Sequence, residues 1–201
     1  MFDSRIRQLI DTPLNAAGRQ LSAMGVSANV VTCAGFAIGM SGAIAIAFDA
    51  VVVGLVLILF SRLADGLDGA IARATQKTDL GGFLDIVLDF IFYGAVPLAF
   101  AVLNPEQNAL PAAVLLLSYF ANGSTFLAYA IMAEKRNIET TAQGVKSLYY
   151  MTGLAEGGET IAAIILFCLF PAYFPFIAYG YAALCYASAA ARIVLAWRTL
   201  R

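Results

Sequence analysis

Four aspartates within a short stretch of an otherwise apolar sequence are the residues best suited to chemistry. They form two pairs, Asp65 with Asp68 and Asp85 with Asp89. Spacings of three and four residues place the members of each pair on one face of a helix. Carboxylates that lie close together in an apolar setting repel each other and lose hydration. A divalent cation relieves both penalties, so the sequence predicts a site for Mg²⁺ or Mn²⁺, which prefer hard oxygen ligands.

The same stretch contains residues that suit a phosphate group. Gly66 and Gly69 have no side chain, so a phosphate can approach the helix backbone beside the aspartates. Arg73 follows Gly69 by one helical turn and carries a planar fork of donors suited to phosphate. Glycines in membrane helices also serve close helix packing, and this alternative stays open for both. We assign Gly35 and Gly39 to such packing.

Together these residues resemble the signature of the CDP-alcohol phosphotransferase family, D-x-x-D-G-x-x-A-R, a short spacer, and G-x-x-x-D-x-x-x-D. The spacer, residues 74–80, is one residue shorter than is usual in the family. The residues that fill the fixed positions are Asp65, Asp68, Gly69, Ala72, Arg73, Gly81, Asp85 and Asp89.

The resemblance implies an enzyme of phospholipid biosynthesis. Such an enzyme transfers a phosphatidyl group from CDP-diacylglycerol to the hydroxyl of a small polar alcohol and releases CMP. The resemblance also implies that the four aspartates hold two metal ions, and that Asp89 is the general base for the attacking hydroxyl. It further implies a homodimer.

A second motif implies where the cytidine nucleotide binds. Asn29-x-x-Thr32 is similar to an N-x-x-T motif of the family, although Ala28 replaces the usual preceding proline. Thr78 stands three residues before Gly81, where relatives carry a nucleotide-contacting Ser or Thr. An N-cap role for Asn29 stays open as an alternative. The nucleotide and donor site implied by the resemblance comprises Asn29, Thr32, Gly69, Arg73 and Thr78.

The composition excludes several classes of protein. With 61% hydrophobic and only 12% charged residues, the chain is not an ordinary soluble domain. Its net charge of −1 argues against a nucleic-acid partner. The absence of histidine excludes imidazole bases and histidine metal sites. We expect the three cysteines to be buried small hydrophobic residues.

The chain is predicted to be an all-α integral membrane protein with a single domain, residues 1–201. A membrane helix needs about 20 apolar residues, and six segments meet this requirement. They are residues 27–48, 50–74, 80–103, 108–134, 147–170 and 173–197. Residues 2–22 show the apolar periodicity of an amphipathic helix in the membrane interface, which Thr12-Pro13 interrupts or kinks. A disordered polar leader is the alternative.

The distribution of cations predicts the orientation. Of the 12 Lys and Arg residues, all except Arg62 lie at the termini or on alternate connections. The positive-inside rule then places both termini and the aspartates on the cytoplasmic side of a bacterial inner membrane.

The aspartates also match in depth. Asp65 and Asp89 lie fifteen and fourteen residues from the outer ends of their helices. At 1.5 Å per residue, these separations place them about 22 and 21 Å deep, and place Asp68 and Asp85 both about 27 Å deep. An antiparallel pair of helices would therefore bring all four carboxylates together.

The acceptor site is predicted among polar residues nearer the C-terminus. Two glutamates in a predicted membrane helix need a polar cavity or a cationic partner. A phosphorylated acceptor, which the resemblance favours, would use the cations, whereas an ammonium acceptor would use the glutamates. A structural ion pair of one glutamate with Arg192 or Arg62 is the alternative. The candidates are Arg136, Lys146, Glu156, Glu159 and Arg192.

Two other functions stay open at this point. One reverses the substrates, with a CDP-amino-alcohol donor and a diacylglycerol acceptor. The other is an ion- or proton-coupled transporter that uses the acids as a relay. A transporter, however, gives no reason for D-G-x-x-A-R.

Overall fold

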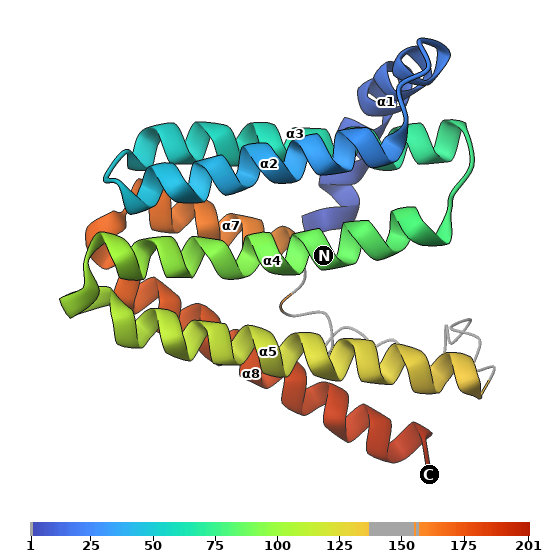
Figure 1. Ribbon diagram of the computed structural model, residues 1–201. Coiled ribbons are helices and arrows are strands. Elements are labelled where there is room, and N and C mark those ends of the chain that lie inside the picture. Colours follow the sequence, from blue (N-terminus) through green and yellow to red (C-terminus); the bar gives the residue numbers. More distant parts are fainter. Residues whose placement is uncertain (1, 137–154, 156) are drawn as a thin grey trace. The chain divides into compact units, whose positions relative to one another are not determined.

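The computed structural model describes residues 2–136, 155 and 157–201, with only the backbone of residues 2–11, and this part of the chain is all-helical (Figure 1). The helices are α1 (Phe2–Ala23), α2 (Ala28–Ala47), α3 (Val51–Ala74), α4 (Asp79–Leu103), α5 (Pro105–Lys135), α7 (Gly157–Leu169), the 3₁₀ helix η1 (Pro171–Tyr173) and α8 (Phe174–Thr199). The predicted bounds of α2, α3 and α4 agree with the observed bounds to within a residue.

Four helical segments of the described chain are long and apolar enough to cross a membrane. They are α2, α4, α5 and the segment Pro171–Thr199. Large apolar side chains point outward from them, for example Phe120 and Phe176, which are 74% and 75% exposed. Outward apolar surface of this kind suits contact with lipid, so the chain is an integral membrane protein. The predicted count of six spans stays a prediction, because α3 carries several charges and α7 has 13 described residues.

The N-terminal segment is a helix, α1, and not a disordered leader. The helix continues through Pro13, so the predicted break is wrong, whereas the alternative of a kink at Thr12-Pro13 stays a prediction. Its position in the membrane interface stays a prediction.

Residues 1–103 form one compact unit, in which α2 packs against both α3 and α4, and α1 packs against α3. Small residues allow α2 and α3 to approach closely. A methyl group added to Gly35 would lie 2.9 Å from Ala64 Cβ, and one added to Gly39 would lie 2.7 Å from Ser61 Oγ. These glycines therefore serve helix packing, as predicted.

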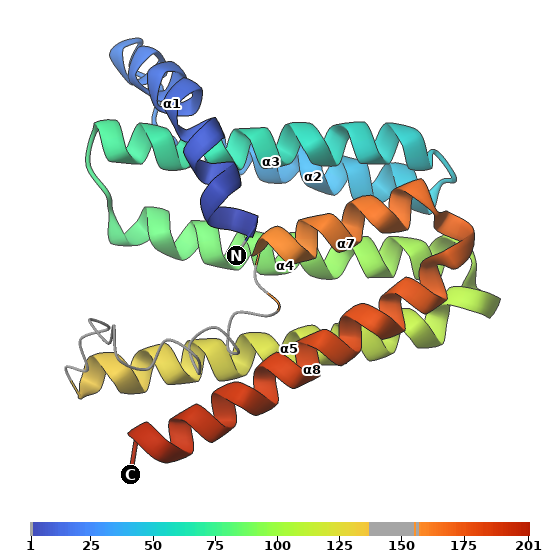
Figure 2. The ribbon, with the colours of Figure 1, turned by 180° about the vertical axis from the view of Figure 1, so that it is seen from behind.

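Residues 104–201 form a second compact unit. In it α5 and α8 lie side by side, and α7 contacts α8 and η1 (Figure 2). Its core includes Leu115, Ile164, Phe167 and Phe174, all fully buried. The prediction of a single domain stays a prediction.

The cysteines differ from one another. Cys168 and Cys185 are buried, as predicted, whereas Cys33 is exposed. The buried face of α2 contains Gly35, Gly39 and Gly42, and the helical period places Cys33 outside that face. The prediction was therefore wrong for Cys33.

Candidate active site

Three of the four aspartates come together beside the connection between α3 and α4. Asp65 and Asp68 lie on α3, and Asp85 lies near the start of α4. One carboxylate oxygen from each lies within 4.8 Å of the other two. Asp68 is buried, Asp65 is half-buried and Asp85 is exposed, so the group is open on one side. Spacing and depth predicted that all four carboxylates come together, and the structure groups three of them.

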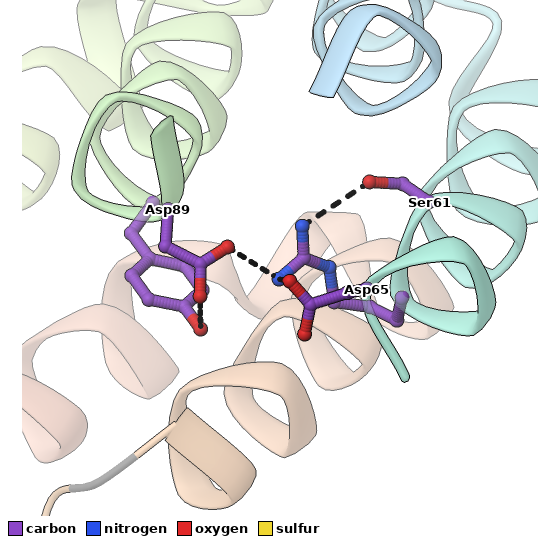
Figure 3. Close-up of polar contacts among 5 residues, drawn as sticks. Ser61, Asp65 and Asp89 are labelled. Carbon is purple, nitrogen blue, oxygen red and sulfur yellow. Dashed lines mark hydrogen bonds and ion pairs between the residues drawn. The ribbon is translucent and has the colours of Figure 1, made fainter. Parts of the chain in front are cut away.

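The fourth aspartate has other partners. Asp89 accepts a hydrogen bond at Oδ1 from Arg62 Nη1, at 2.7 Å, and another at Oδ2 from the Tyr93 hydroxyl, at 3.1 Å (Figure 3). Arg62 Nη1 also lies 3.6 Å from Asp65 Oδ1. Arg62 thus links Asp89 on α4 to Asp65 on α3. In this arrangement both oxygens of Asp89 are engaged by donors of the chain.

Arg62 is held from several sides. Its Nη2 donates to Ser61 Oγ at 3.2 Å, and its guanidinium carbon lies 4.4 Å from the centre of the Phe92 ring. A cation over an aromatic face gains electrostatic attraction. The side chain is only 14% exposed. Arg62 is therefore a half-buried cation within the carboxylate site.

Sequence reasoning assigned no site role to Arg62 or Tyr93. A signal was available, because Arg62 stands three residues before Asp65 and Tyr93 stands four residues after Asp89. Those spacings put each residue on the same helix face as its aspartate. Arg62 had been weighed only as a partner for a glutamate, whereas the structure pairs it with Asp89 and Asp65.

The residues present fit a divalent metal ion. The three grouped ligands are all carboxylates, the donor type that Mg²⁺ and Mn²⁺ prefer. Asp68 Oδ2 is buried and has no hydrogen-bond partner among the described residues. A buried carboxylate oxygen without a partner is costly, and a bound cation removes that cost.

The predicted nucleotide residues lie where the start of α2 meets the start of α4. The Gly81 amide donates to Thr78 Oγ1 at 3.0 Å, so Thr78 caps the start of α4. A methyl group added to Gly81 would lie 3.1 Å from Asn29 Oδ1. The N-cap alternative for Asn29 is wrong, because the Ser27 side chain caps α2 by accepting from the Val30 amide. The side-chain amide of Asn29 therefore points toward Gly81 in α4.

Thr32 lies one turn further along α2 and borders a cleft. Its hydroxyl donates to the Ala28 carbonyl at 3.0 Å. The cleft has an empty volume of about 240 Å³, open solvent included, and lies among α2, α3 and α4. One part of its lining is charged, with Arg62 and three aspartates, whereas Phe36 and Leu88 make another part apolar. With a divalent cation on the aspartates, this combination would suit a phosphate attached to a lipid.

Arg73 lies over Gly69 at the end of α3. Its Nη1 would be 3.3 Å from a methyl group added to Gly69, and its Nε and Nη2 both donate to Asn15 Oδ1 on α1. Gly66 differs, since a methyl group there would lie 3.0 Å from Leu14 Cδ1. The packing alternative therefore holds for Gly66. Gly69 remains beside the arginine, as a phosphate site requires.

The predicted acceptor residues belong to the second unit or lie outside the described residues. Arg192 is 7% exposed, and its Nη1 donates to the Asn122 carbonyl, to Asn122 Oδ1 and to Thr125 Oγ1. Arg136 is exposed at the end of α5, and Glu159 is half-buried in the first turn of α7. Lys146 and Glu156 lie outside the described residues. Their assignment as acceptor residues stays a prediction.

The sequence of this chain is similar to a family model and to several known proteins. The family model described as CDP-alcohol phosphatidyltransferase matches residues 25–198. The inner membrane protein YnjF of Escherichia coli is 43% identical over 201 residues, which cover 100% of this chain and 98% of that protein. An archaetidylinositol phosphate synthase of Pyrococcus horikoshii is 28% identical over 170 residues, 84% of this chain and 83% of that protein. A bifunctional IPC transferase and DIPP synthase of Archaeoglobus fulgidus is 32% identical over 174 residues, 84% of this chain but 32% of that protein.

Proposed function

The chain belongs to the CDP-alcohol phosphatidyltransferase family, and from this premise we propose that it transfers a phosphatidyl group from CDP-diacylglycerol to the hydroxyl of a small polar alcohol. CMP is the second product. Family membership makes the chain a membrane-bound transferase of substituted phosphate groups, which argues against the transporter alternative. The observation that carries the proposal is the grouping of Asp65, Asp68 and Asp85 within 4.8 Å beside Arg73 and Gly69.

The family generally depends on a divalent metal, and we assign the metal ligands to Asp65, Asp68, Asp85 and Asp89. Bound Mg²⁺ or Mn²⁺ would neutralise the pyrophosphate and stabilise the charge that develops on CMP. Three of these ligands already face one another. Asp89 would be a fourth ligand if its carboxylate were released by Arg62, which would keep Asp65 as a partner.

The reaction needs a base for the acceptor hydroxyl, and Asp89 takes this role. The hydroxyl oxygen attacks the phosphorus that carries diacylglycerol, and the bond from that phosphorus to the CMP oxygen breaks. The hydroxyl proton passes to the Asp89 carboxylate. Tyr93 donates to this carboxylate and so fixes its orientation.

The nucleotide end of the donor is assigned to residues around the starts of α2 and α4. Asn29, Thr32 and Thr78 offer neutral hydrogen-bonding groups for cytidine, while Arg73 over Gly69 offers a cation for the pyrophosphate. The apolar part of the cleft, with Phe36 and Leu88, suits the lipid part of the donor.

A phosphorylated alcohol is our preferred acceptor. One relative is named as a synthase of archaetidylinositol phosphate, which favours an acceptor that carries phosphate. Arg136, Lys146 and Arg192 are then the expected acceptor contacts, with Glu156 and Glu159 important instead for an ammonium acceptor. The homodimer and the cytoplasmic orientation of the site belong to the same proposal.

The test uses purified protein in detergent with labelled CDP-diacylglycerol and a panel of alcohols: glycerol phosphate, inositol phosphate, serine and choline. We expect CMP release and a new phospholipid with a phosphorylated alcohol when Mg²⁺ or Mn²⁺ is present, and neither product from an Asp68→Asn variant. A parallel reaction contains a CDP-amino-alcohol and diacylglycerol. Turnover only in that reaction would overturn the proposed donor.

A further inference from the structure

The N-terminal helix is docked on the helix that carries the motif. Leu14 and Gly18, four residues apart on one face of α1, both meet α3. A methyl group added to Gly18 would lie 2.7 Å from Ala70 Cβ and 2.8 Å from the Ala70 carbonyl carbon. Such distances mean that the two helices touch almost backbone to backbone. The C-terminal half of α1 is therefore fixed against the motif segment of α3.

This docking brings Asn15 to Arg73, which is 58 residues away in the sequence. Asn15 Oδ1 accepts from Arg73 Nε at 3.2 Å and from Nη2 at 3.0 Å. One edge of the guanidinium is thus held by a single amide oxygen. The remaining nitrogen, Nη1, lies on the side of Gly69.

The choice of a neutral partner matters for a phosphate site. Among the side chains that the structure describes, which begin at Thr12, no carboxylate forms an ion pair with Arg73. An amide oxygen fixes the guanidinium while leaving its positive charge uncompensated, whereas an aspartate in the same place would neutralise that charge. A freely rotating arginine would have to be immobilised when the donor binds, and this ordering weakens binding.

We propose that Asn15 is a positioning residue of the donor site: from the docked α1 it holds the Arg73 guanidinium over Gly69, ready for the pyrophosphate of the donor. The proposal rests on the proposed function. It makes α1 a part of the binding site, in addition to any role at the membrane surface.

The first test is a set of variants in the CMP-release assay with CDP-diacylglycerol. Asn15→Ala is expected to raise the donor KM roughly three- to tenfold, while kcat and the acceptor KM change less than about twofold. Gln20→Ala, an exposed amide on the same helix, is the matched control and should change nothing. Asn15→Asp keeps both hydrogen bonds but adds a negative charge, so it should also raise the donor KM without lowering the melting temperature.

The decisive test is a double-mutant cycle with Arg73→Ala. If Asn15 acts through Arg73, then Asn15→Ala causes no further rise in donor KM once Arg73 has been removed. An equal rise in both backgrounds would overturn the proposal, as would a fall in kcat with the donor KM unchanged. If Asn15→Ala fails to fold, the uncharged and similarly sized Asn15→Leu carries the same cycle. Wild-type protein that releases no CMP from CDP-diacylglycerol would instead contradict the proposed function.

Discussion

The two halves of α3 are held in different ways. In the first half, Gly54 faces Gly42 and Ile46 of α2, and Ile46 and Ile58 are fully buried. In the second half, Arg62 is half-buried and Asp68 is buried, and Asp68 Oδ2 has no partner among the described residues. The first half, residues 51–60, is therefore the filled half, in which apolar side chains pack closely. The second half, residues 61–74, contains polar groups that could bind a ligand.

This difference separates stability from activity along a single helix. Adding an atom to the filled half should destabilise the protein without changing its chemistry. Removing a carboxylate that does not pair with Arg62 from the second half should remove the chemistry at little or no cost in stability, because fewer like charges then face one another. The predictions below test that separation.

The largest effect is expected from removing the metal or one of its ligands. A chelator should abolish CMP release, and Mg²⁺ or Mn²⁺ should restore it. Asp→Asn at position 65, 68, 85 or 89 should each lower kcat/KM at least about tenfold, because each carboxylate is assigned to the metal. Melting temperatures of the Asp68→Asn and Asp85→Asn variants in chelator should stay at or above the wild-type value, because neither aspartate pairs with Arg62.

The control for this prediction is Asp79→Asn, which changes an exposed aspartate of α4 outside the cluster. It should retain activity. Full activity of the wild-type protein in chelator would show that the second half of α3 does not work through a metal.

The next largest effect is expected from overpacking the first half of α3. Gly54→Ala places a methyl group 2.5 Å from Ile46 Cγ1 and 2.8 Å from the Gly42 carbonyl oxygen. We expect it to lower the free energy of unfolding by about 1 to 3 kcal/mol, as overpacking usually does. The specific activity of the folded fraction should be unchanged.

Gly82→Ala is the matched control, because a methyl group there meets nothing within 4 Å. This change in α4 should leave the stability unchanged or raise it slightly, since alanine favours a helix over glycine. Chemical or thermal unfolding in detergent measures both variants. Equal stability of the two would show that the first half of α3 is not tightly packed.

Features that depend on spacing and depth along a helix could be predicted from the sequence, whereas other contacts between helices could not. Spacing along one helix predicted α2, α3 and α4, and also the grouping of Asp65, Asp68 and Asp85, because helix periodicity and depth are local properties. The partners of Asp89 could not be predicted in this way, since Arg62 lies on α3 and contacts Asp89 on another helix, α4. The contact of Asn15 with Arg73 depends on where α1 docks, and no local pattern specifies that.

The smallest effect concerns Arg62, which separates the two halves. In the structure it compensates the charges of Asp89 and Asp65, as a bound metal would. Arg62→Met should therefore destabilise the protein in chelator by about 1 to 2 kcal/mol, less than for a fully buried pair because the carboxylates are partly exposed. Adding Mg²⁺ should recover much of that loss.

Melting curves with chelator and with Mg²⁺ measure this difference without relying on activity. The rise in melting temperature caused by Mg²⁺ should be larger in Arg62→Met than in the wild-type protein, because the ion then supplies the only compensating charge assigned to these carboxylates. Phe36→Leu, which changes the apolar part of the same cleft, is the control and should show the wild-type rise. An equal rise in melting temperature for Arg62→Met and the wild-type protein would contradict the prediction. It would mean that Arg62 and the metal ion do not compensate the same carboxylate charges.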